Sequence, residues 1–249
     1  MYPHGWFVVA MSGEVTQEGE LATRYFEQPI RLWRDDTGNV CTDGWTTCER
    51  NGLVFVSYPK GNAAPGYEIP SLAENDSDEW EPWSLKCLEI ATQSREVVEN
   101  VADRGHFLPV HGTRFDSFEA EFVDHMAIQR TKGSGSEDFP LSPFESEATY
   151  YGPSFQITRL FTRNIWSLLL NTHTMIDSTK LHLWFGVKIQ KSKHSQRFID
   201  AYVTDVREGF LQDVAIWEHK KWRDNPVLCD GDGPIMKLRK WYSQFYETA

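Results

Sequence analysis

The feature that most constrains the fold is an apolar stripe late in the chain, between Gln196 and Lys220. Hydrophobic residues recur there at intervals of three and four, which is typical of a long amphipathic helix with one face on a core. The stripe consists of Phe198, Ile199, Tyr202, Val206, Phe210, Ile216 and Trp217. Such a helix needs a broad apolar surface to cover, so the rest of the chain must supply one.

Asp213 falls in the middle of this stripe. An ionised carboxylate in an apolar seam is costly unless it is paired with a cation or bound to a metal. Gly209, one turn earlier on the same stripe, removes a side chain where a ligand would need room. Two interpretations of Asp213 follow. It is a metal ligand, or it is one half of a buried salt bridge to an arginine or lysine.

Two histidines, His106 and His111, stand five positions apart. Five helical steps turn two side chains well apart, so these residues cannot share one face of a helix. Pro109 disfavours the α conformation at Leu108 and removes a backbone donor. We therefore expect a helix from about Ser94 that ends near His106, followed by a turn that swings His111 back beside it.

Two imidazoles so placed can bind one metal from one side. Together with Asp213 they make a set of two histidines and one carboxylate, which suits non-heme Fe(II) oxygenases. The alternative is two unrelated polar residues at a helix exit. His173 is expected to be a satisfied histidine of a sheet. We assign no site to the remaining candidates His125, His182, His194 and His219.

The segments before the long helix predict an antiparallel sheet. Residues Lys180–Gln190 alternate, with Leu181, Leu183, Phe185, Val187 and Ile189 on one face and Lys180, His182, Lys188 and Gln190 on the other. This period of two predicts one buried side. Further strands are expected at Ser84–Thr92, Phe118–Gln129, Ala148–Leu160 and Ile165–Thr174, and a shorter helix at Gly233–Tyr246. A sheet covered by one long late helix is an α+β architecture.

The first part of the chain predicts a separate small β unit. Short strands are expected at Trp6–Met11, Thr23–Trp33 and Leu53–Tyr58, with turn signals between them. A Pro- and Gly-containing stretch and the acidic run Glu74–Glu81 then read as a connector. We therefore expect a β domain over residues 1–70 and a second domain over residues 83–249.

Charge and composition limit the partners. A net charge of −11 without a cluster of lysines and arginines argues against a nucleic acid or an anionic membrane. No apolar run approaches transmembrane length, and the one near the start is too short for a signal peptide. Ten tryptophans suggest a roomy cavity for an apolar ligand, with Phe155, Trp184 and Phe185 as lining candidates or core residues.

The four cysteines, Cys41, Cys48, Cys87 and Cys229, form neither a Cys-x-x-Cys pair nor a disulfide framework. The simplest interpretation is reduced thiols in a cytoplasmic protein.

The run Glu99–His111 resembles the iron-binding segment of Rieske non-heme iron oxygenases. The pattern of that segment is Asn, two residues, Asp, two residues, His, four residues, His. Two later segments, Gly209–Lys220 and Arg239–Tyr246, look especially like the terminal oxygenase of the 3-ketosteroid 9α-hydroxylase type. The likeness extends over nearly all of the chain.

This resemblance implies that His106, His111 and Asp213 hold a mononuclear Fe(II), which binds O2 beside the substrate. Asp103 would be the carboxylate that passes electrons from a neighbouring subunit's Rieske cluster, and Asn100 the residue beside the iron. The resemblance also implies a helix-grip catalytic domain, of the Bet v1-like or START-like kind. Members of the family are commonly trimers, because the electron route crosses between subunits.

The chain departs from the family at the cluster. A Rieske [2Fe-2S] centre needs two cysteines and two histidines, spaced in the family as Cys-x-His and later Cys-x-x-His. Neither pair occurs, and no histidine stands between His4 and His106. The segment Asp35–Val40 passes directly into Cys41–Trp45, as if the cluster-binding lobe had been excised. We therefore expect no [2Fe-2S] cluster in this chain and a remnant β domain over residues 1–70.

Two functions remain open. The first is an oxygenase subunit that hydroxylates a steroid-like or polycyclic apolar substrate with O2, using electrons from an external reductase, ferredoxin or Rieske protein. The second is a catalytically silent binding or assembly subunit that joins a mixed oligomer with a complete oxygenase. A third, weaker interpretation is an internally truncated product with no native role.

Overall fold

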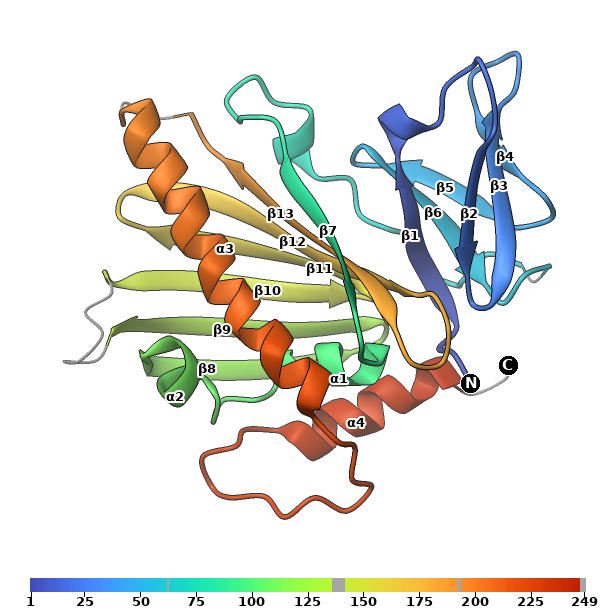
Figure 1. The fold of residues 1–249 in the computed structure, drawn as a ribbon. Helices are drawn as coiled ribbons and strands as arrows, with labels where there is room; N and C mark the ends of the chain where they lie inside the picture. The colour runs from blue at the N-terminus through green and yellow to red at the C-terminus, as the bar shows by residue number, and fades with distance from the viewer. Residues whose placement is uncertain (62, 136–141, 192–193, 247–249) are drawn as a thin grey trace.

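The computed structural model describes residues 1–61, 63–135, 142–191 and 194–246. Its largest element is a seven-stranded antiparallel sheet in the order β7-β13-β12-β11-β10-β9-β8. The strands are β7 (Ser84–Ile90), β8 (Thr113–Val123), β9 (Met126–Gly135), β10 (Phe144–Tyr151), β11 (Phe155–Thr162), β12 (Ile165–Met175) and β13 (Leu181–Ile189). Helix α3 (Gln196–His219) crosses one face of this sheet (Figure 1). This arrangement confirms the predicted combination of an antiparallel sheet with few helices.

The apolar stripe of α3 explains why this helix lies on the sheet. Phe210 stacks on Phe185 of β13 with 3.9 Å between ring centroids, and the Tyr202 hydroxyl lies 2.7 Å from Ser167 Oγ on β12. Aromatic stacking of this kind adds to the free energy gained from burial. Ile216 is the exception in the predicted stripe, because 39% of its surface is exposed.

The alternation in β13 predicts one buried face, but the structure covers both. Lys188, on the face predicted to be solvated, is only 5% exposed, as is its neighbour Trp184. Tyr25 from the N-terminal strands lies against this face, with its hydroxyl 2.9 Å from His182 Nδ1. The prediction that only one face of β13 is buried is therefore wrong. A polar residue such as Lys188 gives no sign in the sequence that another layer covers it.

The N-terminal part forms two three-stranded antiparallel sheets, β1-β6-β5 and β2-β3-β4. Their strands are β1 (Gly5–Met11), β2 (Leu21–Tyr25), β3 (Gln28–Arg34), β4 (Val40–Thr42), β5 (Thr47–Arg50) and β6 (Leu53–Tyr58). Phe7 and Phe55 are fully buried, and the Phe55 ring lies 5.3 Å from that of Phe155 on β11. One hydrophobic cluster therefore runs from the small sheets into the large one, and the division at residues 70 and 83 stays a prediction.

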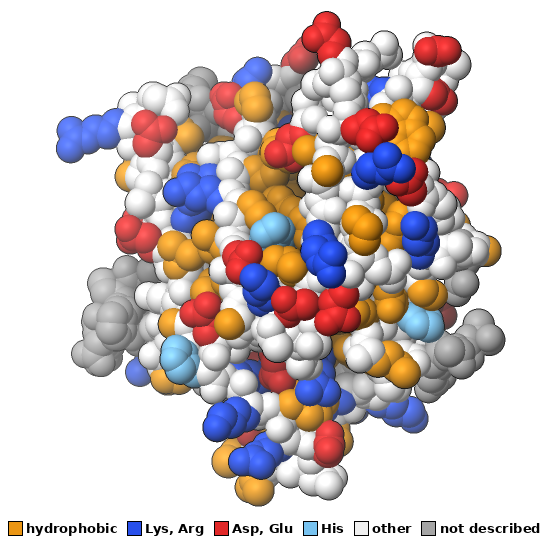
Figure 2. All heavy atoms as spheres, turned by 45° about the vertical axis from the view of Figure 1, so that its right-hand side comes forward, with side chains coloured by type: hydrophobic (Ala, Val, Ile, Leu, Met, Phe, Trp, Pro, Cys, Tyr) orange, Lys and Arg blue, Asp and Glu red, His pale blue; other side chains and the backbone are white. Residues whose placement is uncertain are grey.

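Figure 2 shows the molecule from the side of the N-terminal sheets. Basic and acidic side chains are interspersed over this face, and hydrophobic side chains gather around a hollow near its middle. Among the described residues of this face, positive charge is thus not gathered into one patch.

Three segments predicted as single strands are hairpins. The first, Thr23–Trp33, divides into β2 and β3 at Phe26 and Glu27, whose φ angles are +55° and +62°. The second divides into β8 and β9 at Asp124, and the third into β10 and β11 at Gly152. Phe26 and Glu27 are not turn-forming residue types, so the sequence carries no signal for that turn.

Short helices frame the face of the large sheet on which α3 lies. They are α1 (Ser94–Val98), a 3-10 turn at Glu99–Val101, α2 (Phe107–His111), α4 (Ile235–Ser243) and a 3-10 turn at Gln244–Tyr246. A further pair of 3-10 turns lies at Ser12–Glu14 and Ala73–Asn75. None of the described helices is both long and apolar enough to cross a membrane.

The helix predicted from Ser94 to His106 is interrupted. The chain leaves helical geometry after Val101 and starts a new helix, α2, at Phe107. Pro109 does not break α2, because it occupies the first turn, where a missing N–H leaves no helical hydrogen bond unmade. The backbone carbonyl of Asp232 accepts a hydrogen bond from Arg104 N (3.1 Å) and so holds this interruption against the loop before α4.

Candidate metal centre

The structure brings His106, His111 and Asp213 together. His106 directly precedes α2, His111 ends it, and Asp213 comes from α3 more than a hundred residues later. One ligand atom from each of the three lies within 4.8 Å of the others. Among the described residues, no other group of three His, Cys, Asp or Glu side chains meets this spacing. The His–His–carboxylate set predicted from the sequence is therefore a cluster in space.

Asp213 is buried, with 6% of its surface exposed. Its Oδ1 lies 3.1 Å from His111 Nε2 and 3.7 Å from His106 Nε2, and its Oδ2 accepts a hydrogen bond of 3.0 Å from Asn100 Nδ2. Within the described chain, its ion-pair partners are these two imidazoles rather than an arginine or lysine. The alternative of a buried salt bridge to a guanidinium is therefore not what the structure contains.

The two imidazoles differ in how they are held. His111 Nδ1 lies 2.9 Å from Gln212 Oε1, which fixes its ring and turns Nε2 toward Asp213. Burial acts to lower the pKa of His111, but the hydrogen bond and negative charge of Asp213, together with Gln212, outweigh it and raise that pKa. Both ring nitrogens of His106 are buried and make no hydrogen bond with the described residues.

A buried imidazole without a hydrogen bond is costly. A cation between His106, His111 and Asp213 would satisfy the open nitrogen and neutralise the carboxylate. The residues present therefore fit a divalent metal that accepts nitrogen and oxygen ligands.

Asp103 and Asn100 lie next to this group and contact different members of it. Asp103 Oδ2 is 3.5 Å from His106 Nδ1, and its other oxygen accepts a hydrogen bond from His106 N at 3.3 Å. Burial acts to raise the pKa of Asp103, but the nearby His106 side chain and the hydrogen bond from His106 N outweigh it and lower that pKa below its usual value. Asn100 touches the far carboxylate oxygen of Asp213. Both residues thus contact the triad rather than complete it.

The loop before α4 supplies a residue that sequence reasoning missed. Gly233 has a φ of +81°, and a Cβ there would meet the carbonyl oxygen of Ala102 at 2.3 Å. Only glycine tolerates both the conformation and this close approach. Gly233 therefore lets the loop press against the break between Val101 and Phe107, from which His106 projects. The Gly-Pro pair at this point in the sequence was the available signal.

A cavity of about 660 Å³ opens beside Asp213 and His111. A second space of about 210 Å³ continues it toward the sheet. Residues lining both are Phe107, Phe144, Leu160, Leu169, Phe185 and Phe210. Gly209 lines the larger cavity, and a Cβ added there would meet nothing within 4 Å. Two of the three residues of the triad, His111 and Asp213, therefore lie at the wall of an apolar cavity between α3 and the sheet.

Of the aromatic lining candidates, only Phe185 lines this cavity in the described chain. Phe155 and Trp184 belong to the hydrophobic cluster shared with the N-terminal sheets. His173 is fully buried in β12, as expected for a sheet histidine, but neither ring nitrogen has a hydrogen-bond partner among the described residues. The prediction of a satisfied histidine is thus wrong. Burial lowers the pKa of His173 to about 3, so the ring is neutral.

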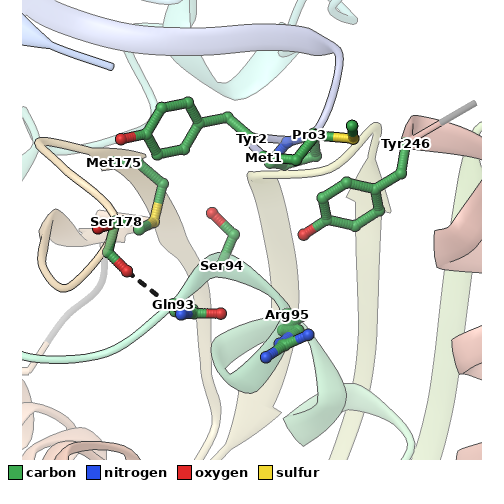
Figure 3. A pocket seen from close by; sticks show the side chains of 9 residues that line it. All are labelled: Met1, Tyr2, Pro3, Gln93, Ser94, Arg95, Met175, Ser178 and Tyr246. Carbon is green, nitrogen blue, oxygen red and sulfur yellow. Dashed lines mark hydrogen bonds between the residues drawn. The ribbon is translucent and has the colours of Figure 1, made fainter. Parts of the chain in front are cut away.

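A separate cavity of about 500 Å³ lies beside α1 (Figure 3). Ser94 and Arg95 of α1 border it, with Tyr2 and Tyr246 on its other sides. The described lining includes no histidine, cysteine or carboxylate. This cavity therefore offers no second metal site.

The four cysteines form no disulfide. All four are free, Cys41 and Cys48 partly buried and Cys87 and Cys229 exposed. Cys41 lies in β4 and Cys48 in β5, and neither belongs to a described group of three potential metal ligands.

Comparison with known proteins identifies the relatives. The chain is 34% identical to a 3-ketosteroid-9-alpha-monooxygenase oxygenase component of Rhodococcus rhodochrous, over 95% of this chain and 69% of the relative. It is 36% identical to the component of that name from Mycobacterium tuberculosis, over 82% of this chain and 58% of the relative. A cholesterol 7-desaturase of Caenorhabditis elegans is 26% identical over 98% of this chain and 61% of the relative.

The alignment with the first of these proteins extends over 270 residues, more than the 249 of this chain. That relative therefore contains residues within the aligned stretch that have no counterpart here.

Among solved structures, dicamba monooxygenase bound to dicamba superposes with a TM-score of 0.76 at 14% identity, covering 97% of this chain and 96% of that one. NdmA of Pseudomonas putida CBB5 with caffeine gives 0.70 at 14% identity, covering 96% and 89%. These two likenesses concern the fold. The family model described as 3-ketosteroid 9alpha-hydroxylase C-terminal domain matches residues 57–246. Since that match takes in the sheet, α3 and the whole His–His–Asp triad, the chain belongs to the 3-ketosteroid 9α-hydroxylase family of Rieske-type oxygenases.

Proposed function

We propose that this chain is an oxygenase subunit in which His106, His111 and Asp213 hold a mononuclear Fe(II). Its reaction is the hydroxylation of a steroid-like or polycyclic apolar substrate with O2, using electrons from an external partner. The observation that carries the proposal is the convergence of these three side chains, with no described hydrogen bond to the His106 ring and with His111 and Asp213 at the wall of an apolar cavity. The names of the relatives supply the substrate class.

The chain's own residues prepare the site in three ways. Phe107, Phe185 and Phe210 line the cavity and exclude water from the side of the substrate. Gln212 holds the tautomer of His111 by its contact with Nδ1. Asn100 occupies one oxygen of Asp213 and leaves the other facing the imidazoles. When bound, Fe(II) supplies the activation of O2, which none of these side chains can provide.

Asp103 is proposed as the entry point for electrons. It contacts His106 Nδ1 on the side away from Asp213, and its side chain is 34% exposed. A carboxylate that is both in contact with a ligand imidazole and open to solvent can meet a donor protein. The resemblance to the family supports the same role.

The electron donor is proposed to be a separate polypeptide. The sequence lacks the Cys-x-His and Cys-x-x-His pairs, and no described cysteine lies in a group of metal ligands. We expect no Rieske absorption or EPR signal after iron–sulfur reconstitution of the purified chain. Such a signal would show that Cys41 or Cys48 is a cluster ligand and would remove the need for a separate donor.

Three broader features belong to the same proposal. The sheet with α3 across it supports a helix-grip domain over residues 83–249, with residues 1–70 as a remnant of the cluster-binding domain. The assembly is proposed to be a homotrimer or a mixed oligomer with a complete oxygenase subunit, and of these only the mixed oligomer would bring a partner's Rieske centre to Asp103. A cytoplasmic location agrees with four free thiols.

The alternative is a catalytically silent subunit that binds an apolar ligand or assembles with an intact homologue. The closed turn between β3 and β4 favours it, because Asp35 Oδ1 accepts hydrogen bonds from Thr37 N and Asn39 N, each at 2.9 Å. The strands are joined by a compact turn at the place where the sequence lacks the cluster lobe. These strands therefore form a hydrogen-bonded sheet without the segment that would bind a cluster.

One experiment separates the two functions. The Fe(II)-loaded chain is supplied with a 3-ketosteroid, 18O2 and electrons from a separate ferredoxin or Rieske protein with its reductase, and the Asp213→Ala variant serves as control. Labelled product from the wild type alone, dependent on the donor, supports the oxygenase. Steroid binding without product supports the silent subunit, and neither binding nor product contradicts both.

A further inference from the structure

A charged cluster with two buried carboxylates, Glu96 and Glu99, includes the residue before Asn100. Lys220 and Arg239 complete the cluster, with Lys220 Nζ 3.3 Å from Glu96 Oε2 and Trp222 packed on Arg239. Glu99 is 5% exposed. Its Oε2 accepts a hydrogen bond of 2.6 Å from Arg239 Nε, and its Oε1 accepts from Arg239 Nη2 (3.1 Å) and Lys220 Nζ (2.8 Å). A two-pronged Arg–carboxylate contact fixes both distance and direction.

The cluster joins three elements that are distant in sequence. Glu99 opens the 3-10 turn after α1, Lys220 is the residue that follows α3, and Arg239 belongs to α4. The Trp222 ring packs against two guanidinium groups, with its centroid 4.3 Å from Arg95 Cζ and 3.8 Å from Arg239 Cζ. The segment that leaves α3 is therefore fastened to both neighbouring helices.

Asn100, the next residue after Glu99, reaches α3 at a second point. Its amide donates to Asp213, two helical turns before Lys220. Adjacent residues of one short turn thus hold α3 at two places along its length. Two attachments fix the rotation as well as the separation of two elements, whereas one attachment leaves α3 free to turn about it.

We propose that Glu99 is a positioning residue of the metal centre, which acts through Asn100 to hold the Asp213 carboxylate in place; this inference rests on the proposed Fe(II) site. Glu99 itself touches neither His106, His111 nor Asp213 in the described contacts. Its contribution is to keep the 3-10 turn at one distance from α3, so that the Asn100 amide meets one carboxylate oxygen and leaves the other for the metal.

A purely structural role for the cluster predicts something different. If Glu99 only stabilised the fold, then its loss would lower the free energy of unfolding of the metal-free protein and leave the metal affinity of the folded fraction unchanged. Its effect would also be independent of Asn100. Metal affinity and its dependence on Asn100 therefore distinguish positioning from stability.

The test measures Co(II) binding to the metal-free full chain by the visible absorption of the bound ion. The variants are Glu99→Gln, Asn100→Ala and the double variant, with urea unfolding of each metal-free protein. We expect Glu99→Gln to weaken Co(II) binding about tenfold in the wild-type background. In the Asn100→Ala background we expect less than about a twofold further loss, since the route through Asn100 is already removed.

Two further variants keep the result decisive. Glu89→Gln removes a carboxylate that lies 2.7 Å from Lys180 in an exposed pair on β7, and it should change Co(II) affinity less than about twofold. If Glu99→Gln fails to fold, Arg239→Lys keeps the charge, loses the two-pronged contact and should still weaken binding about threefold. Unchanged affinity in a folded Glu99 or Arg239 variant, or losses that multiply with Asn100→Ala, would overturn the positioning role. A wild-type chain that binds no Co(II) would instead overturn the metal centre itself.

Discussion

The N-terminal sheets and the half of the molecule that carries the triad are both well packed, but only the second contains a described group of three potential metal ligands. Each contains a two-pronged Arg–Glu pair, Arg34 with Glu49 in the first and Arg239 with Glu99 in the second. Asn100, the residue after Glu99, contacts Asp213 of the group of potential metal ligands. No such group accompanies Glu49 among the described residues.

The difference indicates that the two parts are retained for different reasons. The N-terminal sheets cover the second face of the large sheet, as the contact between Phe55 and Phe155 shows. They are needed for the core whether or not they hold a cluster. Variants that separate stability from metal binding can therefore test each half in turn.

The largest effect is expected from removing a ligand. We predict that Asp213→Ala, like His106→Ala, abolishes stoichiometric iron, because two ligands cannot replace three in a site of this kind. Iron is measured per chain after loading and gel filtration.

Asp205→Ala is the matched control for this loss. Asp205 lies on the same helix and its side chain is 56% exposed in a pair with Arg163, so it should retain iron. Full iron content in both ligand variants would refute the assignment of the triad and erase the contrast between the halves.

The next effect concerns stability in the N-terminal sheets. We predict that Phe55→Ala lowers the free energy of unfolding by about 3–5 kcal/mol, because a fully buried aromatic ring is removed from a packed core. Iron per folded chain should not change, since Phe55 lies on the other face of the large sheet from the triad. Met11→Ala in β1, where 38% of the residue is exposed, should change stability by less than about 0.5 kcal/mol. Loss of iron with Phe55→Ala would show that the two halves are not separable.

The grouping of His106, His111 and Asp213 was predictable because these residues violate local patterns. Asp213 interrupts an apolar stripe, and two histidines flank a proline, so each is conspicuous in the sequence alone. The prediction that these residues meet also does not depend on the exact bounds of the helices. The helix predicted through residue 106 is interrupted after Val101, yet His106 and His111 still meet, because α2 carries His111 back at its end.

Other parts were not predictable because the deciding contacts are distant in sequence. Lys188 is buried, with its Nζ 5.8 Å from the ring of Trp83, a contact that periodicity within β13 cannot reveal. The turn at Phe26 and Glu27 is formed by residues that rarely adopt positive φ. In the structure, backbone hydrogen bonds from these two residues to Met175 and Ile176 secure the turn.

A smaller effect is expected at the cavity. Gly209→Ala should raise the free energy of unfolding by about 1 kcal/mol, since alanine favours a helix and its Cβ meets nothing within 4 Å. Gly209→Phe should weaken steroid binding about tenfold by filling the cavity, about 1.4 kcal/mol, with iron unchanged. Urea unfolding measures the stability of the alanine variant. For the phenylalanine variant, steroid titration followed by tryptophan fluorescence measures steroid affinity, and metal analysis measures iron content. Equal steroid affinity in the phenylalanine variant would place the ligand elsewhere.

The smallest expected effect is the difference between the two Arg–Glu pairs in how the free energy of unfolding depends on pH. Burial acts to raise the pKa of Glu99, but hydrogen bonds and charge from Arg239 and Lys220 outweigh it, so the pKa lies below its usual value. The hydrogen bonds of Arg34 likewise lower the pKa of Glu49. A carboxyl with a lower pKa in the folded state binds fewer protons there than in the unfolded state, so protonation favours unfolding. The stabilisation is present above the unfolded pKa of about 4.3 and is lost as pH falls through the folded value.

Urea unfolding of the metal-free chain at a series of pH values from about 6 downward tests this dependence. Glu99→Gln and Glu49→Gln should each flatten the decline of stability below roughly pH 4.3. The flattening should be greater for Glu99, whose side chain is 6% exposed, than for Glu49 at 33%, because solvent screens the more exposed pair. A larger change with Glu49→Gln would mean that the N-terminal sheets, and not the charged cluster around Glu99, hold the more strongly coupled charge.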